Sequence, residues 1–275
     1  MRRLPLATLA LLVGLAGCAS EQEPDPMPAP VNPVVDPYPD PVGLVNLWHV
    51  EGVGADDVWL RLADRELTVW AECGIAGGAW RAATALFVAD VQQGYGSAGC
   101  MSDPAAELDW LYAATSFEAG ETPETWNLLD TDGDVVATLR VDGAPPASED
   151  LSDDYLLPPV VTQATRDSFG SGSYLVAQSD FRNQIEGRWT ASTAFVEFSA
   201  DGSWTGSDGC NAATGRWVRD DTHFLATSGA STLMGCDSVA VPTWVATAAF
   251  ATISGDGDML EFVGPDGAHL GTVAR

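Results

Sequence analysis

Two stretches of this 275-residue chain repeat the same order of tryptophan and cysteine residues, and this repetition constrains the fold more than any other feature. Because a matched order of landmarks over such a length indicates duplication, we predict two copies of one module. The two cysteines are 27 residues apart in the first stretch and 26 in the second. The landmarks are Trp48, Cys73, Trp80 and Cys100 in the first stretch and Trp189, Cys210, Trp217 and Cys236 in the second.

Each copy is predicted to be mainly β-strand, because short runs rich in β-branched and aromatic residues alternate with Gly or acidic turns. One helix follows the second cysteine, beginning near Asp103 and Pro104 in the first copy and spanning residues 239–250 in the second. We therefore predict a β-rich α+β fold of two similar domains, each a curved antiparallel sheet with one helix covering its concave side or open end. The predicted strands span residues 44–50, 58–62, 66–71 and 84–91, then 187–191, 195–198, 203–206, 215–219 and 223–226.

The first 18 residues combine Arg2 and Arg3, a short apolar run and small residues before Cys18. The run is too short for a membrane span and is typical of a bacterial signal peptide. Its end, Leu-Ala-Gly-Cys, resembles a lipoprotein box, which implies cleavage before Cys18 and acylation of that residue. The predicted place is the exported side of the cell membrane or outer membrane, held by the lipid anchor. The alternative is an ordinary secretory signal that ends in cysteine.

Composition divides the rest of the chain into segments. Proline supplies eight of the 21 residues from 21 to 41, interleaved with acidic residues, which indicates an extended tether. A second tract, rich in Gly, Ser, Pro and acidic residues, is typical of a linker. The predicted segments are a signal peptide (1–17), lipidated cysteine and tether (18–42), first domain (43–141), linker (142–184) and second domain (185–275).

The chain is strongly acidic. Twelve Arg, no Lys and 39 acidic residues give a net charge of −27, or −29 once Arg2 and Arg3 leave with the signal peptide. Nucleic acid is disfavoured as a partner, because its phosphates must be neutralised by clustered Lys and Arg. The acidity is consistent with a role in solubility or a salty habitat, or with attraction of cations and basic partners.

Four cysteines remain after Cys18 is assigned to the lipid, an even number in a compartment that permits disulfides. They allow three connectivities, and the duplication favours Cys73 with Cys100 and Cys210 with Cys236. A four-thiolate zinc site is the alternative, and the absence of any Cys-x-x-Cys spacing disfavours it.

The second copy resembles the META domain family of HslJ-like bacterial lipoproteins. Gly-Arg-Trp at 187–189, Phe198 and the Asp-Gly-Ser turn at 201–203 carry the resemblance, together with the motif residues that follow. The resemblance implies a small exported β-rich domain associated with envelope stress, without catalytic residues or cofactor. In the first copy Gly74 stands where Asn211 stands, so the motif is incomplete there. The motif residues are Asp208, Gly209, Cys210, Asn211, Gly215, Ser231, Thr232, Met234 and Cys236.

Two other motifs are weighed and set aside. Residues 94–99 match a dinucleotide-binding fingerprint, but the predicted helix begins too late to meet a pyrophosphate. Asp130, Asp132 and Asp134 open like a calcium loop, but Val135 and Val141 occupy positions that require glycine and a bidentate acid. A hairpin turn is the favoured interpretation, with weak cation binding as the alternative. We predict no metal ion and no cofactor.

The leading functional hypothesis is a non-enzymatic envelope protein that acts in stress tolerance or binds a protein or peptide; its oligomeric state is left open. One rival is a hydrolase of envelope polymers that uses acidic residues between the two domains. A third hypothesis is strand pairing at an open sheet edge. Matched tryptophans are expected in the core, His49, His223 and His269 on strands, and the unmatched Trp59, Trp70, Trp126 and Trp204 are candidates for a surface groove.

Overall fold

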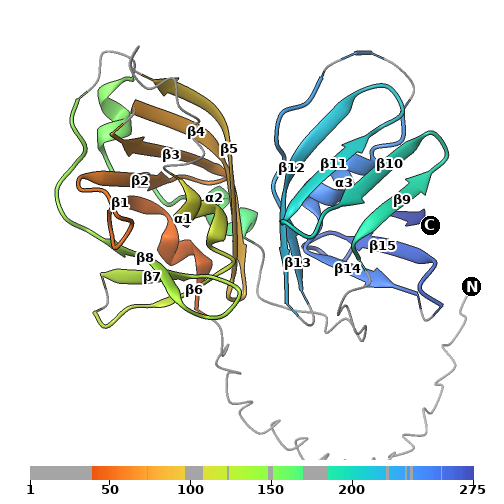
Figure 1. Ribbon diagram of the computed structural model, residues 1–275, viewed down its shortest axis with the longest axis horizontal. Helices are drawn as coiled ribbons and strands as arrows, with labels where there is room; N and C mark the ends of the chain where they lie inside the picture. The colour runs from red at the N-terminus through yellow and green to blue at the C-terminus, as the bar shows by residue number, and fades with distance from the viewer. Residues whose placement is uncertain are drawn as a thin grey trace, which may run out of the picture. The chain divides into compact units, whose positions relative to one another are not determined.

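A computed structural model gives the fold of the chain (Figure 1). All described residues fall in one compact unit. Cys18, Cys73, Cys100, Asp103, Pro104 and Cys236 lie outside the described residues, so the sequence predictions made for them stay predictions. The structure describes residues 39–72, 74–96, 108–122, 124–147, 151–169, 185–220, 223–232, 234–235, 238–254 and 256–275.

The first half forms a closed antiparallel barrel of eight strands in sequence order. Closure comes from β8, which pairs with β1 between Arg140 and His49, and from a short contact of β5 with β6 at Leu86 and Ser116. A helix of five residues, α1 (Asp109–Ala113), buries Trp110 and Leu111. The strands are β1 (Asn46–Glu51), β2 (Val58–Leu62), β3 (Glu66–Ala71), β4 (Gly74–Ala83), β5 (Leu86–Gly96), β6 (Ser116–Ala119), β7 (Thr125–Leu129) and β8 (Val135–Arg140).

The second half is an eight-stranded antiparallel sheet in the order β13-β12-β11-β10-β9-β16-β15-β14. The short helix α3 (Val241–Thr247) carries Pro242 in its first turn and packs Val241 and Val245 into the core of the sheet. The strands are β9 (Gly187–Ala191), β10 (Ala194–Phe198), β11 (Ser203–Ser207), β12 (Ala212–Arg219), β13 (Phe224–Ala226), β14 (Phe250–Ile253), β15 (Met259–Val263) and β16 (His269–Ala274).

The two sheets have the same strand order. We compare β9 to β16, in order, with β1 to β8. Every strand pairing of the first sheet recurs in the second except that of β5 with β6, because the second sheet is open between β13 and β14. The pairing of β9 with β16 matches the pairing of β1 with β8. The duplicated order of landmarks in the sequence thus corresponds to a duplicated topology.

Equivalent tryptophans make equivalent hydrogen bonds. Trp48 Nε1 donates to Leu44 O at 2.8 Å, and Trp189 Nε1 donates to Ile185 O at 2.7 Å, four residues back in both cases. Trp80 Nε1 reaches the carbonyl of the residue after β2, and Trp217 Nε1 that of the residue after β10. All four indoles are buried, which confirms that the matched tryptophans belong to the core.

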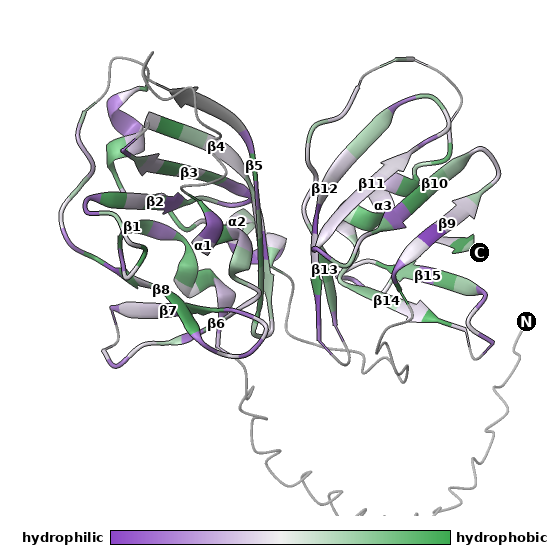
Figure 2. Cartoon of the chain, viewed as in Figure 1, coloured by the Kyte–Doolittle hydropathy of each residue, from purple (hydrophilic) through white to green (hydrophobic). Residues whose placement is uncertain are grey.

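Side chains alternate between core and outer face along the strands, as period two requires. Figure 2 shows polar and apolar residues interleaved along the strands. In β10, Val196 and Phe198 are buried and Glu197 is exposed, so neighbouring side chains face opposite sides of the sheet. No helix among the described residues is long and apolar enough to cross a membrane.

The prediction of a curved sheet with a covering helix is met only in part. The first sheet closes on itself into a barrel, because β8 returns to pair with β1. Strand β4 was not predicted, since its sequence, Gly-Ile-Ala-Gly-Gly-Ala-Trp-Arg-Ala-Ala, consists mostly of Gly and Ala, which do not signal a strand. The start predicted for the first helix falls outside the described residues; the described helix begins at Asp109.

The tract predicted as a linker contains two short helices, η3 (Asp153–Leu156) and α2 (Gln163–Ser168). Thr162 caps α2 by accepting from Thr165 N at 3.1 Å. Phe169 packs on Trp80, with 5.4 Å between ring centroids. Residues 151–169 therefore contact the first barrel rather than only joining two bodies.

Candidate functional site

The motif residues of the second half meet where the loop between β11 and β12 approaches the segment after β13. Asp208 sits at the centre of this loop. Its Oδ1 accepts from the backbone N–H of Cys210 at 2.8 Å and of Asn211 at 2.5 Å. Its Oδ2 accepts from Asn211 Nδ2 at 3.1 Å. The bonds from Asn211, followed by those from Cys210 and Ser238, lower the pKa of the carboxyl to about 2.

Asn211 ties this loop to the second motif segment. Its Oδ1 accepts from Met234 N at 2.5 Å, while its Nδ2 donates to Met234 O at 3.0 Å. Thr232 Oγ1 donates to the same Oδ1 at 3.3 Å and accepts from Ala212 N at 3.0 Å. One side chain with both a donor and an acceptor therefore joins the backbones of two loops, a task that the amide of Asn suits.

Two motif glycines leave room for neighbouring groups. Gly209 adopts a φ of +95°, in the left-handed region that favours glycine. A Cβ on Gly215 would stand 2.5 Å from both Thr227 O and Trp204 Nε1. The Trp204 indole lies across this position to donate to Thr227 O at 3.0 Å. Gly215 is thus required by the close approach of a buried indole to β12.

The remaining motif residues complete the second segment. Ser231 forms an isolated bridge with Ala213. Met234 is 60% exposed, and its carbonyl lies 4.0 Å from Cys210 Sγ. Because Cys236 lies outside the described residues, the pairing of Cys210 with Cys236 stays a prediction.

The geometry of this cluster is that of a structural clasp. The described polar atoms of Asp208, Asn211 and Thr232 bond to one another and to backbone groups. Among the described residues, no group of three or more His, Cys, Asp or Glu gathers to hold a metal ion. Of the motif residues that the sequence singles out, the structure brings together Asp208, Asn211, Thr232 and Met234, and their contacts fix two loops.

Asp208→Asn is expected to reduce stability most near neutral pH. A carboxyl whose folded pKa lies below its unfolded value stabilises the fold above about pH 4 and loses that contribution as pH falls toward 2. The difference in unfolding free energy between wild type and the variant should therefore shrink across this range. Urea denaturation at pH 7, 4 and 2.5 measures it, with the exposed Asp142→Asn as control. A difference independent of pH would contradict this account.

The three histidines lie apart in the sheet order. His49 lies on β1 and His269 on β16, as predicted, while His223 lies just before β13. His223 is buried, and its Nδ1 lies 2.9 Å from Asp220 Oδ2. His269 Nε2 contacts Thr272 Oγ1 at 2.9 Å on the exposed side of β16. The three rings belong to different strands or loops.

The prediction that the unmatched tryptophans line a surface groove is wrong for Trp204, which lies in a core, while Trp59 and Trp70 are covered rather than exposed. Trp59, Trp70 and Trp204 are 5%, 4% and 1% exposed, and Trp126 is partly buried against the barrel core. Trp204 belongs to the core of the second sheet. Trp59 and Trp70 instead form a separate cluster with Leu47 and Ile75, here called the outer aromatic cluster.

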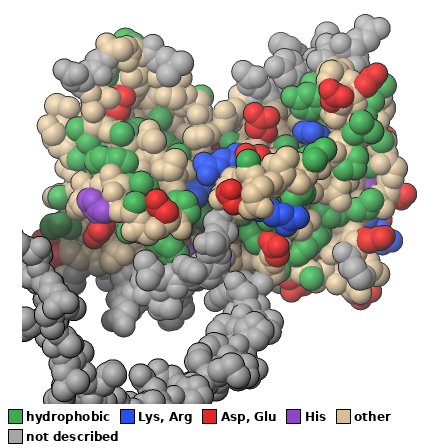
Figure 3. All heavy atoms as spheres, turned by 180° about the vertical axis from the view of Figure 1, so that it is seen from behind, with side chains coloured by type: hydrophobic (Ala, Val, Ile, Leu, Met, Phe, Trp, Pro, Cys, Tyr) green, Lys and Arg blue, Asp and Glu red, His purple; other side chains and the backbone are tan. Residues whose placement is uncertain are grey.

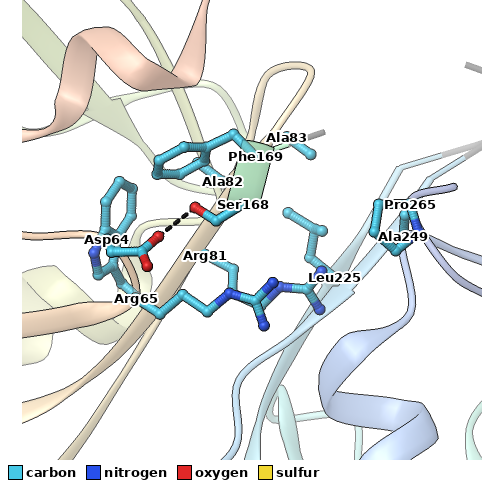
Figure 4. Close-up of a pocket in the computed structure, with 11 residues that line it drawn as sticks. Asp64, Arg65, Arg81, Ala82, Ala83, Ser168, Phe169, Leu225, Ala249 and Pro265 are labelled. Atoms are coloured by element: carbon cyan, nitrogen blue, oxygen red, sulfur yellow. Dashed lines mark hydrogen bonds between the residues drawn. The ribbon is translucent and has the colours of Figure 1, made fainter. Parts of the chain in front are cut away.

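A small cavity of about 30 Å³ lies between β4 of the first half and the edge of the second sheet (Figure 4). Arg81 crosses it and donates from Nη1 to Ala226 O at 3.1 Å and to Ala246 O at 2.8 Å. Burial, with the nearby charge of Arg65, lowers the pKa of Arg81 to about 9, so the group stays charged at neutral pH. Sequence reasoning missed this residue, because no local pattern distinguishes it from other arginines.

Acidic side chains are dispersed over the face seen in Figure 3. Among the described residues, Asp90 on β5 is the acidic group whose pKa is raised, by burial, against the opposing effect of Arg216. Arg216 Nη2 donates to Tyr112 O at 3.2 Å and to Asp201 O at 3.3 Å. The charged group that acts on the pKa of Asp90 is thus the guanidinium of Arg216, not a second carboxylate.

The two motifs that sequence analysis sets aside form ordinary β structure where they are described. Gly94 and Gly96 belong to β5 and pair with β4. Asp130 Oδ1 accepts from the N–H groups of Asp132 and Asp134 at 2.9 and 3.0 Å, and Gly133 adopts a φ of +84°. The hairpin turn predicted between β7 and β8 is confirmed.

The fold places the protein among β-rich proteins built from two eight-stranded antiparallel, barrel-like sheets. Residues 174–251, which include the clasp, match the META domain family. A comparison with curated proteins finds no match. The family resemblance of the second half is confirmed over this range.

Proposed function

We propose that this chain is a lipid-anchored envelope protein that carries two META-like modules on a proline-rich tether and works by binding rather than catalysis. The observation that carries the proposal is the META domain at residues 174–251. The resemblance of the sequence to HslJ-like lipoproteins of this family implies export to the cell envelope. The lipoprotein box at Cys18 supports export and anchoring. The predicted roles are envelope stress tolerance and recognition of a protein or peptide.

We infer further that the first half is a divergent copy of the same module. Its strand order equals that of the second half, and Trp48 and Trp80 donate to carbonyls equivalent to those of Trp189 and Trp217. Gly74, which stands in place of Asn211, is the first residue of β4 and has no side-chain amide that could join two loops. A stabilising role therefore suits the first copy better than a motif-based site.

The clasp supports a non-catalytic role, because its polar atoms are engaged in holding loops together. The rival hydrolase requires two carboxylates about 5 to 10 Å apart with one raised pKa. Asp90 has the raised pKa, but Arg216 is its opposing partner. Burial and an opposing arginine, rather than a second carboxylate, thus account for the shift at Asp90, which disfavours a catalytic dyad there.

Cys18→Ser is expected to move the protein from the membrane fraction to the soluble exported fraction. Two or three acyl chains bury enough methylenes for stable anchoring, and the variant would carry none of them. Fractionation of cells labelled with a palmitate analogue measures both the location and the lipid. Ala19→Ser, which keeps the cysteine, is the control. A variant that is still membrane-bound and labelled would refute the proposed anchor.

A further inference from the structure

The outer aromatic cluster faces away from the barrel core. Its members alternate along β1 to β3 with inward-facing residues: Trp48 follows Leu47, and Leu60 follows Trp59. Apolar side chains on the outer face of a barrel require a cover, because water would otherwise contact them. Leu47, Trp59, Trp70 and Ile75 are nevertheless all at most 9% exposed.

Among the described residues, the partly buried apolar side chains that pack against this cluster come from residues 151–157, here called the strap. It belongs to the stretch that follows β8 and is drawn in green in Figure 1. Leu151 and Tyr155 pack against the cluster, while the 3₁₀ helix η3 has no buried residue of its own. Arg61 on β2 holds the strap: its Cζ lies 5.1 Å from the Tyr155 ring centroid, and its Nε donates to Leu157 O at 3.2 Å.

The strap covers the cluster without satisfying its polar atoms. Trp70 Nε1 and His49 Nδ1 are both buried, and neither has a hydrogen-bond partner among the residues that the structure describes. The His49 ring lies beside Trp59, with 4.9 Å between centroids. Buried polar groups are normally paired, so two orphaned nitrogens on one outer face are an exception that calls for a reason. A ligand that supplies an acceptor to Trp70 Nε1 would bind this face better than the strap does.

We propose that the outer aromatic cluster is a binding groove for a peptide that presents an aliphatic and an aromatic side chain four residues apart, and that the strap occupies this groove within the same chain. The strap itself indicates the ligand: Leu-Ser-Asp-Asp-Tyr-Leu-Leu carries an aliphatic and an aromatic anchor four residues apart, with acidic residues between them. Arg61 supplies the cation that stacks on the aromatic anchor. This inference rests on the proposed binding role and names its site and ligand class.

A tethered occupant competes strongly, because a short linker gives it an effective concentration in the millimolar range. An external peptide therefore gains access to the groove only when the strap is released from it. Substitutions that loosen the packing of the strap should therefore expose the groove to an external peptide. Substitutions in the outer aromatic cluster should abolish binding of that peptide.

The probe is a fluorescently labelled peptide with the sequence of residues 151–157, titrated into the purified full chain. Leu151→Ala/Tyr155→Ala removes both anchors of the strap and is expected to bind the probe at least tenfold more tightly than wild type. Adding Trp70→Ala should abolish the gain. Val160→Ala, at a side chain that is 81% exposed, is the control and should behave as wild type.

Arg61→Met is a second way to release the strap without altering the cluster, and it serves where the double variant does not fold. Its circular dichroism should match wild type while probe binding rises. No gain in either folded variant, or a gain that survives Trp70→Ala, would overturn the proposal. Membrane fractionation reports on the anchor independently, so failure of the groove and failure of the anchoring are distinguishable.

Discussion

Gly215→Ala is expected to lower the free energy of unfolding by about 1–3 kcal/mol, the usual cost of forcing atoms into a filled core. The new methyl would stand 2.5 Å from Thr227 O and Trp204 Nε1, so the indole must leave its hydrogen bond or the strand must shift. Urea denaturation followed by far-UV circular dichroism measures the change.

Gly235→Ala provides the matched control for Gly215→Ala. It lies in the same motif region, a Cβ there meets no atom within 4 Å, and its backbone does not need glycine. We expect its unfolding free energy to stay within about 0.5 kcal/mol of wild type. Equal effects of the two substitutions would mean that the close approach of Trp204 does not explain Gly215.

Arg81→Met is expected to cost about 2 kcal/mol, because one charged donor serves two carbonyls that would lose their partner. One carbonyl, Ala226 O, lies on β13, the open edge of the second sheet. The other, Ala246 O, lies in the last turn of α3, where helix carbonyls lack partners of their own. Calorimetry should show a lower midpoint of unfolding for the variant than for wild type.

Arg65→Met tests whether the effect of Arg81→Met comes from the loss of a positive charge at the cavity or from the loss of the two hydrogen bonds. Arg65 is exposed, and its charge lowers the pKa of Arg81, so its removal relieves repulsion and should leave stability unchanged or slightly raised. If Arg65→Met destabilised the protein as much as Arg81→Met, the effect would not come from the two hydrogen bonds.

Local pattern was sufficient to predict much of the fold. Strands β2, β3 and β9 have the bounds that their β-branched and aromatic residues indicate, and the repeated landmarks indicate the repeated topology. Barrel closure was not predictable, because it depends on the pairing of β1 with β8, residues far apart in the sequence. Strand β4 escaped prediction because its Gly and Ala residues carry no strand signal.

The candidate sites show a similar division. The META resemblance identified the clasp residues, but only the structure shows that Asn211 bonds to Met234, because these residues are far apart in the sequence. Composition indicated a linker where the strap lies, because Leu151 and Tyr155 are isolated apolar residues within an acidic and proline-rich sequence. Trp59 and Trp70 were expected on a surface groove, and they do lie on the outer face, but under that strap.

The central claim is that one module occurs twice, with equivalent residues in equivalent structural roles. Disulfide mapping of the exported, unreduced protein by peptide mass spectrometry tests it most directly. The account predicts two linkages, Cys73 with Cys100 and Cys210 with Cys236, each closed within its own half. A linkage that joins the two halves, or free thiols at one pair and a disulfide at the other, would contradict it.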